Sequence, residues 1–401
     1  MGKRPDRTSA DLELTYLVDM TQRTFSTASL AIAAGLFFWH SASQAESINA
    51  GEHGSSSNHP FTVQAVAEFE TPWAIAFLPD GRMLITEKLG RIFLTTQNGE
   101  KLEVGNVPAV AASGQDGLLD IAIAPDFATS SRIYFTYVQP GEEGSRLVLS
   151  RATLSVTDSA ATLADEAVIW RQAPAGGSGQ PGGIIAFDPK GTHLFLTVGD
   201  RMRPKSAQNP GEARGKLLRL NLDGSTPADN PHAAVGGVEG ETWTTGHRNP
   251  YGLAFAPDGR LWLHEMGPRG GDELNLIEPG QKYGWPLVSN GDNYSGTPIP
   301  RHTTRPEFAA PQVYWSPVIA PAGLAFYQGS MSPRWQGSAL IGGLKVQSLL
   351  RVGFRAGGQP DESDRWKLDG RIRDVAVAPD GAVWLIEDSD PGRLMRLSPE
   401  D

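Results

Sequence analysis

The chain has 401 residues, with 46 glycines, 30 prolines, no cysteine and a formal net charge of −10. Because glycine and proline break helix interiors and collect in turns, their abundance excludes a mainly helical bundle. The negative charge argues against an electrostatic nucleic-acid binder, and the missing cysteines exclude disulfides, thiolate metal sites and cysteine nucleophiles. The length suits two or three domains, or one closed all-β domain.

Residues 1–45 carry the features of an export signal. A basic residue follows Met20, an apolar run covers 30–39, and small residues precede Ala45. An apolar run too short to span a bilayer, followed by small residues, is typical of a secretory signal peptide. We expect translation to start at Met20, cleavage after Ala45, and a periplasmic or secreted protein with no stable membrane insertion. The alternative is a buried helix of the mature domain.

Six later segments share one pattern, which is a short apolar strand, a turn that is often Pro-Asp-Gly, and a second strand. Each segment reads as a β-hairpin. Hairpin units that recur about every 45 to 70 residues have to stack on one another, because one unit alone does not bury its own apolar face. The strands of the repeat begin near Ala74, Ile121, Ile185, Leu253, Leu324 and Val375.

These repeats predict an all-β fold, a six-bladed β-propeller of four-stranded antiparallel blades, over residues 61–401. Residues 46–60 are predicted to be a solvated linker. The segments 61–69 and 393–397 are expected to complete one shared blade and close the ring. The alternative is a pair of β-sandwiches with coincidental turns. Because propellers bind ligands where loops converge on the central channel, we expect the chemistry in the segments between repeats.

Two of these segments place polar side chains directly before an inner strand. Gln115 and Asp116 precede the second repeat, where they face the channel or, in the case of Asp116, cap a turn. Arg248 and Asn249 precede the fourth repeat. An arginine there suits a ligand with a carboxylate or a quinone, because the guanidinium presents a forked pair of donors. A structural arginine between two blades is the alternative.

The segment 267–275 combines glycines with an acidic pair. Glycines expose main-chain carbonyls, and Asp272 and Glu273 supply hard carboxylate oxygens. Calcium takes six to eight oxygen ligands of these kinds, so the segment is a candidate calcium loop. A Gly-Gly-Asp turn is also ordinary loop chemistry.

Three further cations come from the last two repeats, which neighbour the first repeat in a closed ring. Lys345, Arg371 and Arg373 would converge with Arg248 in a protein whose net charge is negative. Such a convergence makes a local anion site. Solvated surface charges are the alternative.

Several motifs together resemble the soluble aldose sugar dehydrogenases of the glucose/sorbosone dehydrogenase family, which use pyrroloquinoline quinone (PQQ). The resemblance runs in order from about residue 61 to 397 and implies a six-bladed propeller, PQQ and Ca²⁺ as cofactors, and a small sugar as substrate. The implied reaction is hydride transfer from the anomeric carbon of an aldose to the quinone, which gives a lactone. The motifs are at 71–82, 114–120, 246–250, 267–273 and 283–286.

The resemblance also assigns roles in cofactor and substrate binding. Gln115 matches the family's substrate-side glutamine, and Asp116 lies beside it. Arg248 and Asn249 match the pair that touches the quinone, where the arginine stabilises negative charge on a quinone oxygen. Further cofactor contacts are implied at Tyr294, Lys345, Arg371 and Arg373.

For calcium, the resemblance implies ligands at Glu273 and at Tyr283, the latter through its carbonyl oxygen. Gly267 and Pro268 of the same loop complete the predicted metal residues. In this family calcium supports assembly and activates the quinone as a Lewis acid.

One departure concerns the general base. Gln180 stands where the family has a histidine, and Ile184 stands where it has an arginine. An amide orients a hydroxyl but does not accept its proton, so Gln180 is a catalytic-site residue without the usual function. Either Asp200 or Asp116 serves as the base, or the substrate differs, or catalysis is vestigial. His193 is a poor replacement because it lies in a hairpin turn.

Two other functions stay open. The changes at Gln180 and Ile184 favour a non-catalytic propeller that binds a ligand or a partner protein, whereas the retained Arg248 and Asn249 favour the dehydrogenase. A calcium-dependent lactonase or esterase is the third reading, weakened by the absence of a channel histidine. The protein is predicted to be a monomer or a homodimer, and no electron acceptor is predicted.

Overall fold

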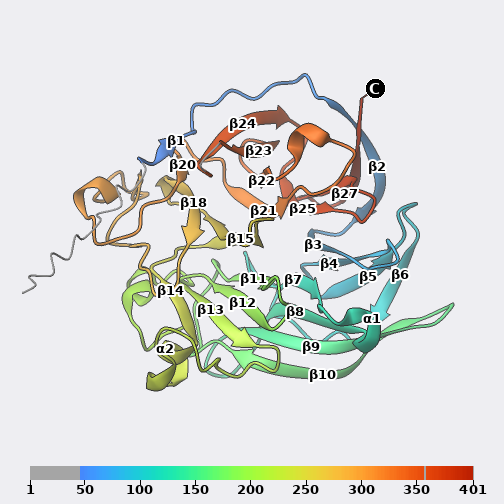
Figure 1. Ribbon diagram of the computed structural model, residues 1–401. Coiled ribbons are helices and arrows are strands. Elements are labelled where there is room, and N and C mark those ends of the chain that lie inside the picture. The colour runs from blue at the N-terminus through green and yellow to red at the C-terminus, as the bar shows by residue number, and fades with distance from the viewer. Residues whose placement is uncertain (1–45, 356–357, 401) are drawn as a thin grey trace, which may run out of the picture. The chain divides into compact units, whose positions relative to one another are not determined.

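The computed structural model of the protein describes residues 46–355 and 358–400, and this part of the chain is nearly all β-sheet (Figure 1). The export signal predicted with a start at Met20 and cleavage after Ala45 lies outside the described residues. The helices are short: α1 (Phe127–Ser130), α2 (Gly237–Glu241) and four single turns of 3-10 helix at Pro204–Gln208, Ala233–Val235, His302–Thr304 and Pro333–Trp335. Within the described part of the chain, no helix has the length and apolar character needed to cross a membrane.

Each of the six predicted repeats forms an antiparallel hairpin. The apolar residues of the repeat become two adjacent strands, and the polar residues between them become the turn. The first strands are β3 (Pro72–Phe77), β7 (Leu118–Ile123), β11 (Gly182–Phe187), β15 (Pro250–Phe255), β21 (Pro321–Phe326) and β25 (Ile372–Val377). The second strands are β4 (Met83–Glu87), β8 (Arg132–Gln139), β12 (His193–Val198), β16 (Leu261–Glu265), β22 (Ala339–Gly343) and β26 (Val383–Glu387).

Further strands extend each hairpin into a larger sheet. In chain order they are β5 (Arg91–Thr95), β6 (Lys101–Gly105), β9 (Arg146–Val156), β10 (Ala161–Arg171), β13 (Lys216–Asn221), β14 (Thr242–Thr245), β18 (Asp272–Ile277), β20 (Val313–Trp315), β23 (Ser348–Phe354), β24 (Pro360–Lys367) and β27 (Gly392–Pro399). Parallel pairing of β6 with β10 joins the first two groups into one eight-stranded sheet. Two very short strands, β17 (Arg269–Gly270) and β19 (Gly291–Asp292), pair with each other.

The last sheet contains both ends of the folded region. Strand β2 (Phe61–Phe69) pairs antiparallel with β27, which gives the order β2-β27-β26-β25. This is the pairing expected from the sequence segments 61–69 and 393–397. The chain therefore returns at its end to the strand that precedes the first hairpin.

The first strands contact one another in the order β3, β7, β11, β15, β21, β25 and back to β3. Threonines of the second strands bridge neighbouring sheets. The hydroxyl of Thr86 donates to the Leu119 carbonyl at 2.7 Å, and that of Thr136 donates to the Gly183 carbonyl at 2.6 Å. Because these hydroxyls are fully buried, the hydrogen bonds are needed to offset the loss of water.

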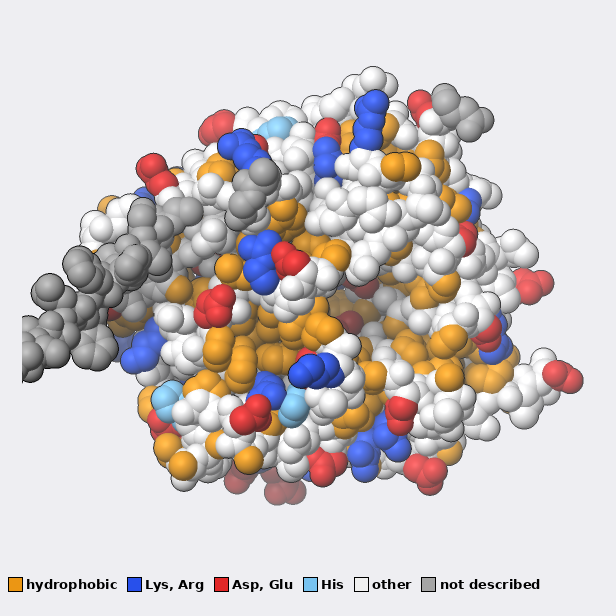
Figure 2. Space-filling view, viewed as in Figure 1, with side chains coloured by type: hydrophobic (Ala, Val, Ile, Leu, Met, Phe, Trp, Pro, Cys, Tyr) orange, Lys and Arg blue, Asp and Glu red, His pale blue; other side chains and the backbone are white. Residues whose placement is uncertain are grey.

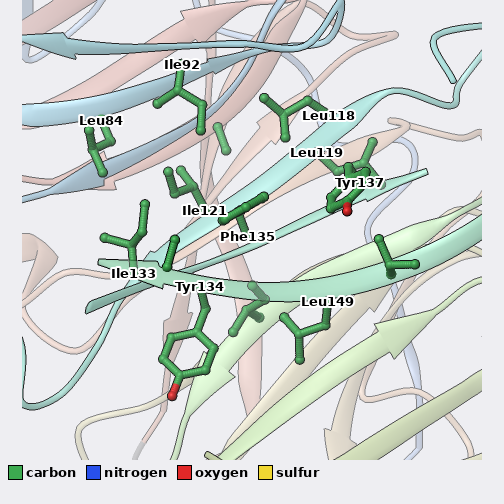
Figure 3. Packing of buried hydrophobic residues seen from close by; sticks show 14 of the residues in the cluster. Leu84, Ile92, Leu118, Leu119, Ile121, Ile133, Tyr134, Phe135, Tyr137 and Leu149 are labelled. Atoms are coloured by element: carbon green, nitrogen blue, oxygen red, sulfur yellow. The ribbon is translucent and has the colours of Figure 1, made fainter. Parts of the chain in front are cut away.

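The apolar core lies between neighbouring sheets. Figure 3 shows one part of it, in which Leu84 and Ile92 of the first group of strands lie near Ile121 and Ile133 of the second group. Each of these side chains is at least 97% buried. Full burial of one such aliphatic side chain contributes about 1.5–3 kcal/mol, so sheet stacking supplies most of the stabilisation.

The segment predicted as a linker, 46–60, is mostly exposed but contacts two sheets. Its strand β1 (Ile48–Asn49) pairs in parallel with β20, and Ser56 forms a bridge with Trp366 of β24. The Ala50 carbonyl accepts a hydrogen bond from the buried Arg365 guanidinium at 2.9 Å. The start of the described chain is thus fixed against the outer strands.

Candidate active site

The predicted site residues lie on loops at one end of the hairpins. Gln180 and Arg248 precede first strands, whereas Asp200 and Gly267 follow second strands. In an antiparallel hairpin the start of the first strand lies beside the end of the second. Both kinds of loop therefore reach the same end of the sheets, where their polar side chains meet.

Gln180 lies between Asp200 and Arg248. Its amide oxygen accepts from Arg248 Nη2 at 2.7 Å, and its amide nitrogen donates to Asp200 Oδ1. These neighbours fix the orientation of the amide, because a carboxylate only accepts hydrogen bonds and a guanidinium only donates them. The backbone N–H of Gln180, at a left-handed φ of 44°, donates to Gln115 Oε1 at 2.6 Å. Four of the predicted residues thus form one hydrogen-bonded chain.

Asp200 is fully buried and is held by uncharged donors. The indole N–H of Trp285 donates to its Oδ2 at 2.8 Å, and the backbone N–H of Met202 donates to its Oδ1 at 2.9 Å. Burial raises the pKa of Asp200 to about 6, although the Trp285 hydrogen bond and the Arg248 charge act in the opposite direction. A carboxyl group with this pKa exchanges protons close to neutral pH.

Asp116 is held in a different way. Arg201, whose side chain is fully buried, donates to the two carboxylate oxygens of Asp116 at 2.5 and 3.0 Å. The same guanidinium donates to the carbonyl of Gly179, next to Gln180, at 3.0 Å. A bidentate pair with a guanidinium fixes the carboxylate in one orientation. Asp116 therefore fixes the loop that carries Gln180.

Arg248 has acceptors on both sides of its guanidinium. Nη1 donates to the carbonyls of Met266 at 2.9 Å and Gly267 at 3.0 Å, and Nη2 donates to the Tyr294 hydroxyl at 3.2 Å. The guanidinium carbon lies 5.4 Å from the ring centre of Trp285, which is within cation–π range. Tyr294 is 70% exposed, so this arginine lies near the mouth of the site.

Two buried polar atoms beside Arg248 lack partners. The Oδ1 atom of Asn249 and the hydroxyl of Tyr251 have no hydrogen-bond partner in the described part of the chain, although both side chains are at least 97% buried. An unsatisfied buried polar atom is costly, and native proteins retain it mainly where a ligand or another function requires it.

The predicted cations of the last repeats form a second group. Arg371 donates to Asp388 Oδ2 at 2.8 Å, and Arg373 donates to Asp388 Oδ1 at 2.6 Å. The Arg373 guanidinium also lies 4.3 Å from the ring centre of Trp73. Lys345 is exposed on the loop after β22. Asp388 offsets part of the positive charge, so this region is less cationic than the sequence suggested.

The predicted calcium residues border a small acidic cavity. Glu273 lies directly opposite Glu265 across β18 and β16, and the Asn275 amide donates to these carboxylates at 3.2 and 3.3 Å. Burial, together with the charge of Glu265, raises the pKa of Glu273 well above its ordinary value. Gly267 and Tyr283 also line this cavity. The centre of a water-sized sphere can move within a volume of about 10 Å³ in it. One water molecule or one ion fills a space of this size.

Within residues 46–355 and 358–400, no group of three or more His, Cys, Asp or Glu side chains converges on a metal position. A metal ion in the acidic cavity would therefore depend on carbonyl oxygens as well as carboxylates. Pro268 is buried next to Gly267, and its carbonyl oxygen is the atom that would act as a metal ligand.

Comparison with known proteins decides the family. The model of the family described as glucose/sorbosone dehydrogenase matches residues 69–396. The chain belongs to this family. It is 39% identical to the aldose sugar dehydrogenase YliI of Escherichia coli K12, over 83% of this chain and 91% of the relative. It is 28% identical to quinoprotein glucose dehydrogenase B of Acinetobacter calcoaceticus, over 82% of this chain and 86% of that protein.

Solved structures of glucose/sorbosone dehydrogenase relatives have the same fold. The apo form of the soluble aldose sugar dehydrogenase from Escherichia coli superposes with a TM-score of 0.79 at 37% identity, covering 85% of this chain and all of that one. The PQQ-bound aldose sugar dehydrogenase of Streptomyces coelicolor gives a TM-score of 0.69 at 27% identity, over 86% of this chain and all of that one. The family resemblance inferred from the sequence motifs is confirmed.

Three residues of this family member were not found by sequence reasoning. Arg201 binds Asp116, Trp285 binds Asp200, and Glu265 accepts the Arg248 backbone N–H at 2.5 Å. The sequence carried a weak signal for two of them, since Arg201 follows Asp200 directly and Trp285 lies in the motif 283–286. Their roles depend on contacts between distant loops, which a single sequence does not reveal.

Proposed function

We propose that this protein is a quinone-dependent dehydrogenase that oxidises aldose sugars at the anomeric carbon to lactones, with PQQ as the hydride acceptor. The observation that carries the proposal is the Arg248 site, in which a guanidinium near the mouth adjoins the unsatisfied Oδ1 of the buried Asn249. Membership of the glucose/sorbosone dehydrogenase family and the PQQ-bound relative support it.

We also propose that the fold is the six-bladed propeller of four-stranded antiparallel blades. Six hairpins, the circular order of contacts among their first strands, and the pairing of β2 with β27 support this assignment. In such a propeller the loops around Gln180, Arg248 and Asp200 surround the mouth of the central channel.

PQQ carries carboxylates and a quinone, and the charges of the site fit both. Lys345, Arg371 and Arg373 are the cations that would meet its carboxylates, and Arg248 and Asn249 would hold the quinone edge. When bound, the quinone supplies the hydride acceptor. Arg248 is held by fixed carbonyls, so its charge is already oriented toward an oxygen that becomes negative.

The acidic cavity fits a calcium ion. Glu273 and the carbonyl of Tyr283 are the proposed ligands, with Glu265 as an additional carboxylate. The carbonyls of Gly267 and Pro268 are proposed to hold calcium on the cofactor side. Oxygen donors of these kinds are those that calcium prefers, and the ion would remove the repulsion between the two buried glutamates.

Asp200 is the proposed base in place of the family's histidine. Asp116 is less suited, because Arg201 already occupies its carboxylate. In the described structure the Gln180 amide occupies Asp200 Oδ1, so a substrate hydroxyl has to replace that hydrogen bond before its proton moves. Gln115 and Gln180 are proposed to orient the sugar hydroxyls.

For localisation we propose export to the periplasm or secretion, with a mature chain that starts at Glu46. The signal-like sequence of residues 1–45 and the absence of cysteine support this proposal.

The test is reconstitution of the chain from Glu46 with PQQ and Ca²⁺, followed by dye reduction with a panel of aldoses. We expect a change in cofactor absorbance on binding and dye reduction with at least one aldose. Absence of both changes would overturn the proposal. The second candidate, a ligand-binding propeller without catalysis, is favoured by Gln180 and Ile184 and predicts sugar binding by calorimetry with no dye reduction.

A further inference from the structure

The inner strands enclose a channel that the proposed site does not use. Every one of β3, β7, β11, β15, β21 and β25 contributes to the wall of a cavity with a volume of about 170 Å³ for the centre of a water-sized sphere. About 10–15 Å³ by this measure holds one water molecule, so the cavity has room for several. Figure 2 shows one face of the molecule hollowed near its middle, with apolar side chains around the hollow.

In each inner strand an alanine directly follows the residues that line the cavity. These alanines are partly exposed and pack against the hydrophobic clusters between the strands. The residues are Ala76, Ala122, Ala186, Ala254, Ala325 and Ala376.

Two carboxyl groups face the cavity, two residues before the alanine in their strands. Asp120 Oδ2 accepts from the Ile185 backbone N–H at 2.7 Å, and Asp374 Oδ2 accepts from the Ile75 backbone N–H at 2.8 Å. Neither carboxylate has a salt-bridge partner within the described ranges. Burial raises the pKa of Asp120 to about 8, with the charge of Asp374 adding to the rise, and burial raises the pKa of Asp374 to about 7.

The wall of this cavity is shared with the candidate site. Arg373, a proposed cofactor contact, lines the cavity together with Trp73 and Tyr251. Its guanidinium lies over the ring of Trp73 and is paired with Asp388. Its charge lowers the pKa of Asp374, but the effect of burial is larger. Among the described residues that line the cavity, the titratable side chains are those of Asp120, Tyr251, Arg373 and Asp374.

We propose that the channel is a proton path, in which water and the carboxyl groups of Asp374 and Asp120 carry protons from the floor of the site to solvent. The inference rests on the proposed dehydrogenase function. Oxidation of an aldose to a lactone breaks one C–H and one O–H bond and releases two electrons and two protons. An acceptor that takes electrons alone leaves both protons to be discharged to solvent. A polar, hydrated cavity with exchangeable carboxyl groups meets that requirement.

The first test uses the mature chain loaded with PQQ and Ca²⁺, an active aldose, and two electron acceptors. Ferricyanide takes electrons only, whereas a two-electron indophenol dye also takes protons. Asp374→Asn and Asp120→Asn should each slow ferricyanide reduction about 10²-fold, the low end of what a positioned proton-transfer group contributes. Both variants should leave indophenol reduction unchanged. The control is Asp258→Asn, on the turn between β15 and β16.

The second test needs no activity. Infrared titration of the cofactor-free protein with ¹³C-labelled aspartate should show two carboxyl groups that titrate with pKa values of about 7 and about 8, above Asp200 and Asp272, whose pKa values are about 6. Asp374→Asn and Asp120→Asn should each remove one of these two upper titrations. Melting temperatures of all variants check that the fold is intact.

The outcomes separate the two proposals. If the wild-type chain reduces no acceptor with any aldose, the proposed function fails. If it is active but Asp374→Asn and Asp120→Asn leave ferricyanide reduction unchanged, only the proton path fails. The path is likewise overturned if these two substitutions remove no carboxyl titration with a pKa of about 7 to 8.

Discussion

Asp116 and Asp200 lie on two loops of the same site, and they differ in what holds them. Asp116 receives two hydrogen bonds from the fully buried guanidinium of Arg201. Asp200 receives its hydrogen bonds from an indole, a backbone N–H and the Gln180 amide, all of them uncharged. The first carboxylate is committed to the structure, whereas the second keeps a pKa of about 6 and remains available for a proton. The charge of the hydrogen-bond donor, more than the depth of burial, distinguishes the structural role of Asp116 from the proposed role of Asp200 as a base.

The strongest test of this difference removes the proton acceptor. In the reconstituted enzyme, Asp200→Asn should lower kcat by about 10²- to 10⁴-fold, because a positioned general base contributes that much. The melting temperature should change little, since asparagine still accepts the Trp285 hydrogen bond. Asp258→Asn on an outer turn is the matched control. Full activity of Asp200→Asn would assign the base elsewhere.

The complementary test breaks the structural pair. Arg201→Met should destabilise the fold by about 3–5 kcal/mol, because it leaves the Asp116 carboxylate buried and unpaired. Urea denaturation measures this free energy of unfolding. The double variant with Asp116→Asn should recover part of the loss. If the single variant is as stable as the wild type, the pair does not anchor the loop.

A third variant introduces at position 180 the histidine that the family resemblance leads us to expect there. Gln180→His should raise kcat by roughly 10²-fold, because Asp200 is already placed to accept a hydrogen bond from the imidazole. Gln180→Asn, which shortens the amide, is the control and should give no gain. If the Gln180→His protein binds the cofactor but is inactive, the site must differ from the family in more than its proposed base.

The smallest expected effect concerns the pH dependence. As a base, Asp200 has to be ionised, so kcat/KM should rise with pH through about 6. Trp285→Phe removes a hydrogen bond that favours the ionised form, and it should move this rise to higher pH by roughly one unit. Trp170→Phe, which removes a similar hydrogen bond from β10 to Glu241 of α2, should leave the profile in place. A profile that does not move would mean that Trp285 does not tune the base.

The fold could be predicted largely from local sequence patterns. Each hairpin consists of two apolar segments with a turn between them, so its signal lies within about 15 contiguous residues. The pairing of β2 with β27 was expected from two alternating segments at the chain ends, and it is present. These features need no knowledge of side-chain direction.

The site could be predicted only in part. The motifs pointed to Arg248 and Asn249 and to Gln180 as the expected departure from the family pattern. They did not give the partners that decide the chemistry, since Arg201 and Trp285 reach their carboxylates from residues 85 positions away. Such contacts depend on how the loops of different sheets turn toward one another, and this is fixed by the assembled fold.

The pairing of β2 with β27 also constrains the order in which the protein folds. Strand β2 is the first long strand to be synthesised and β27 is the last, so β2 has no partner until residue 399 has been made. A contact of such large sequence separation forms slowly. During synthesis β2 therefore remains an open edge, which favours pairing with other chains. A chain that is kept unfolded until it is complete does not expose this open edge. Loss of the final strand β27 would leave the edge of β2 permanently unpaired.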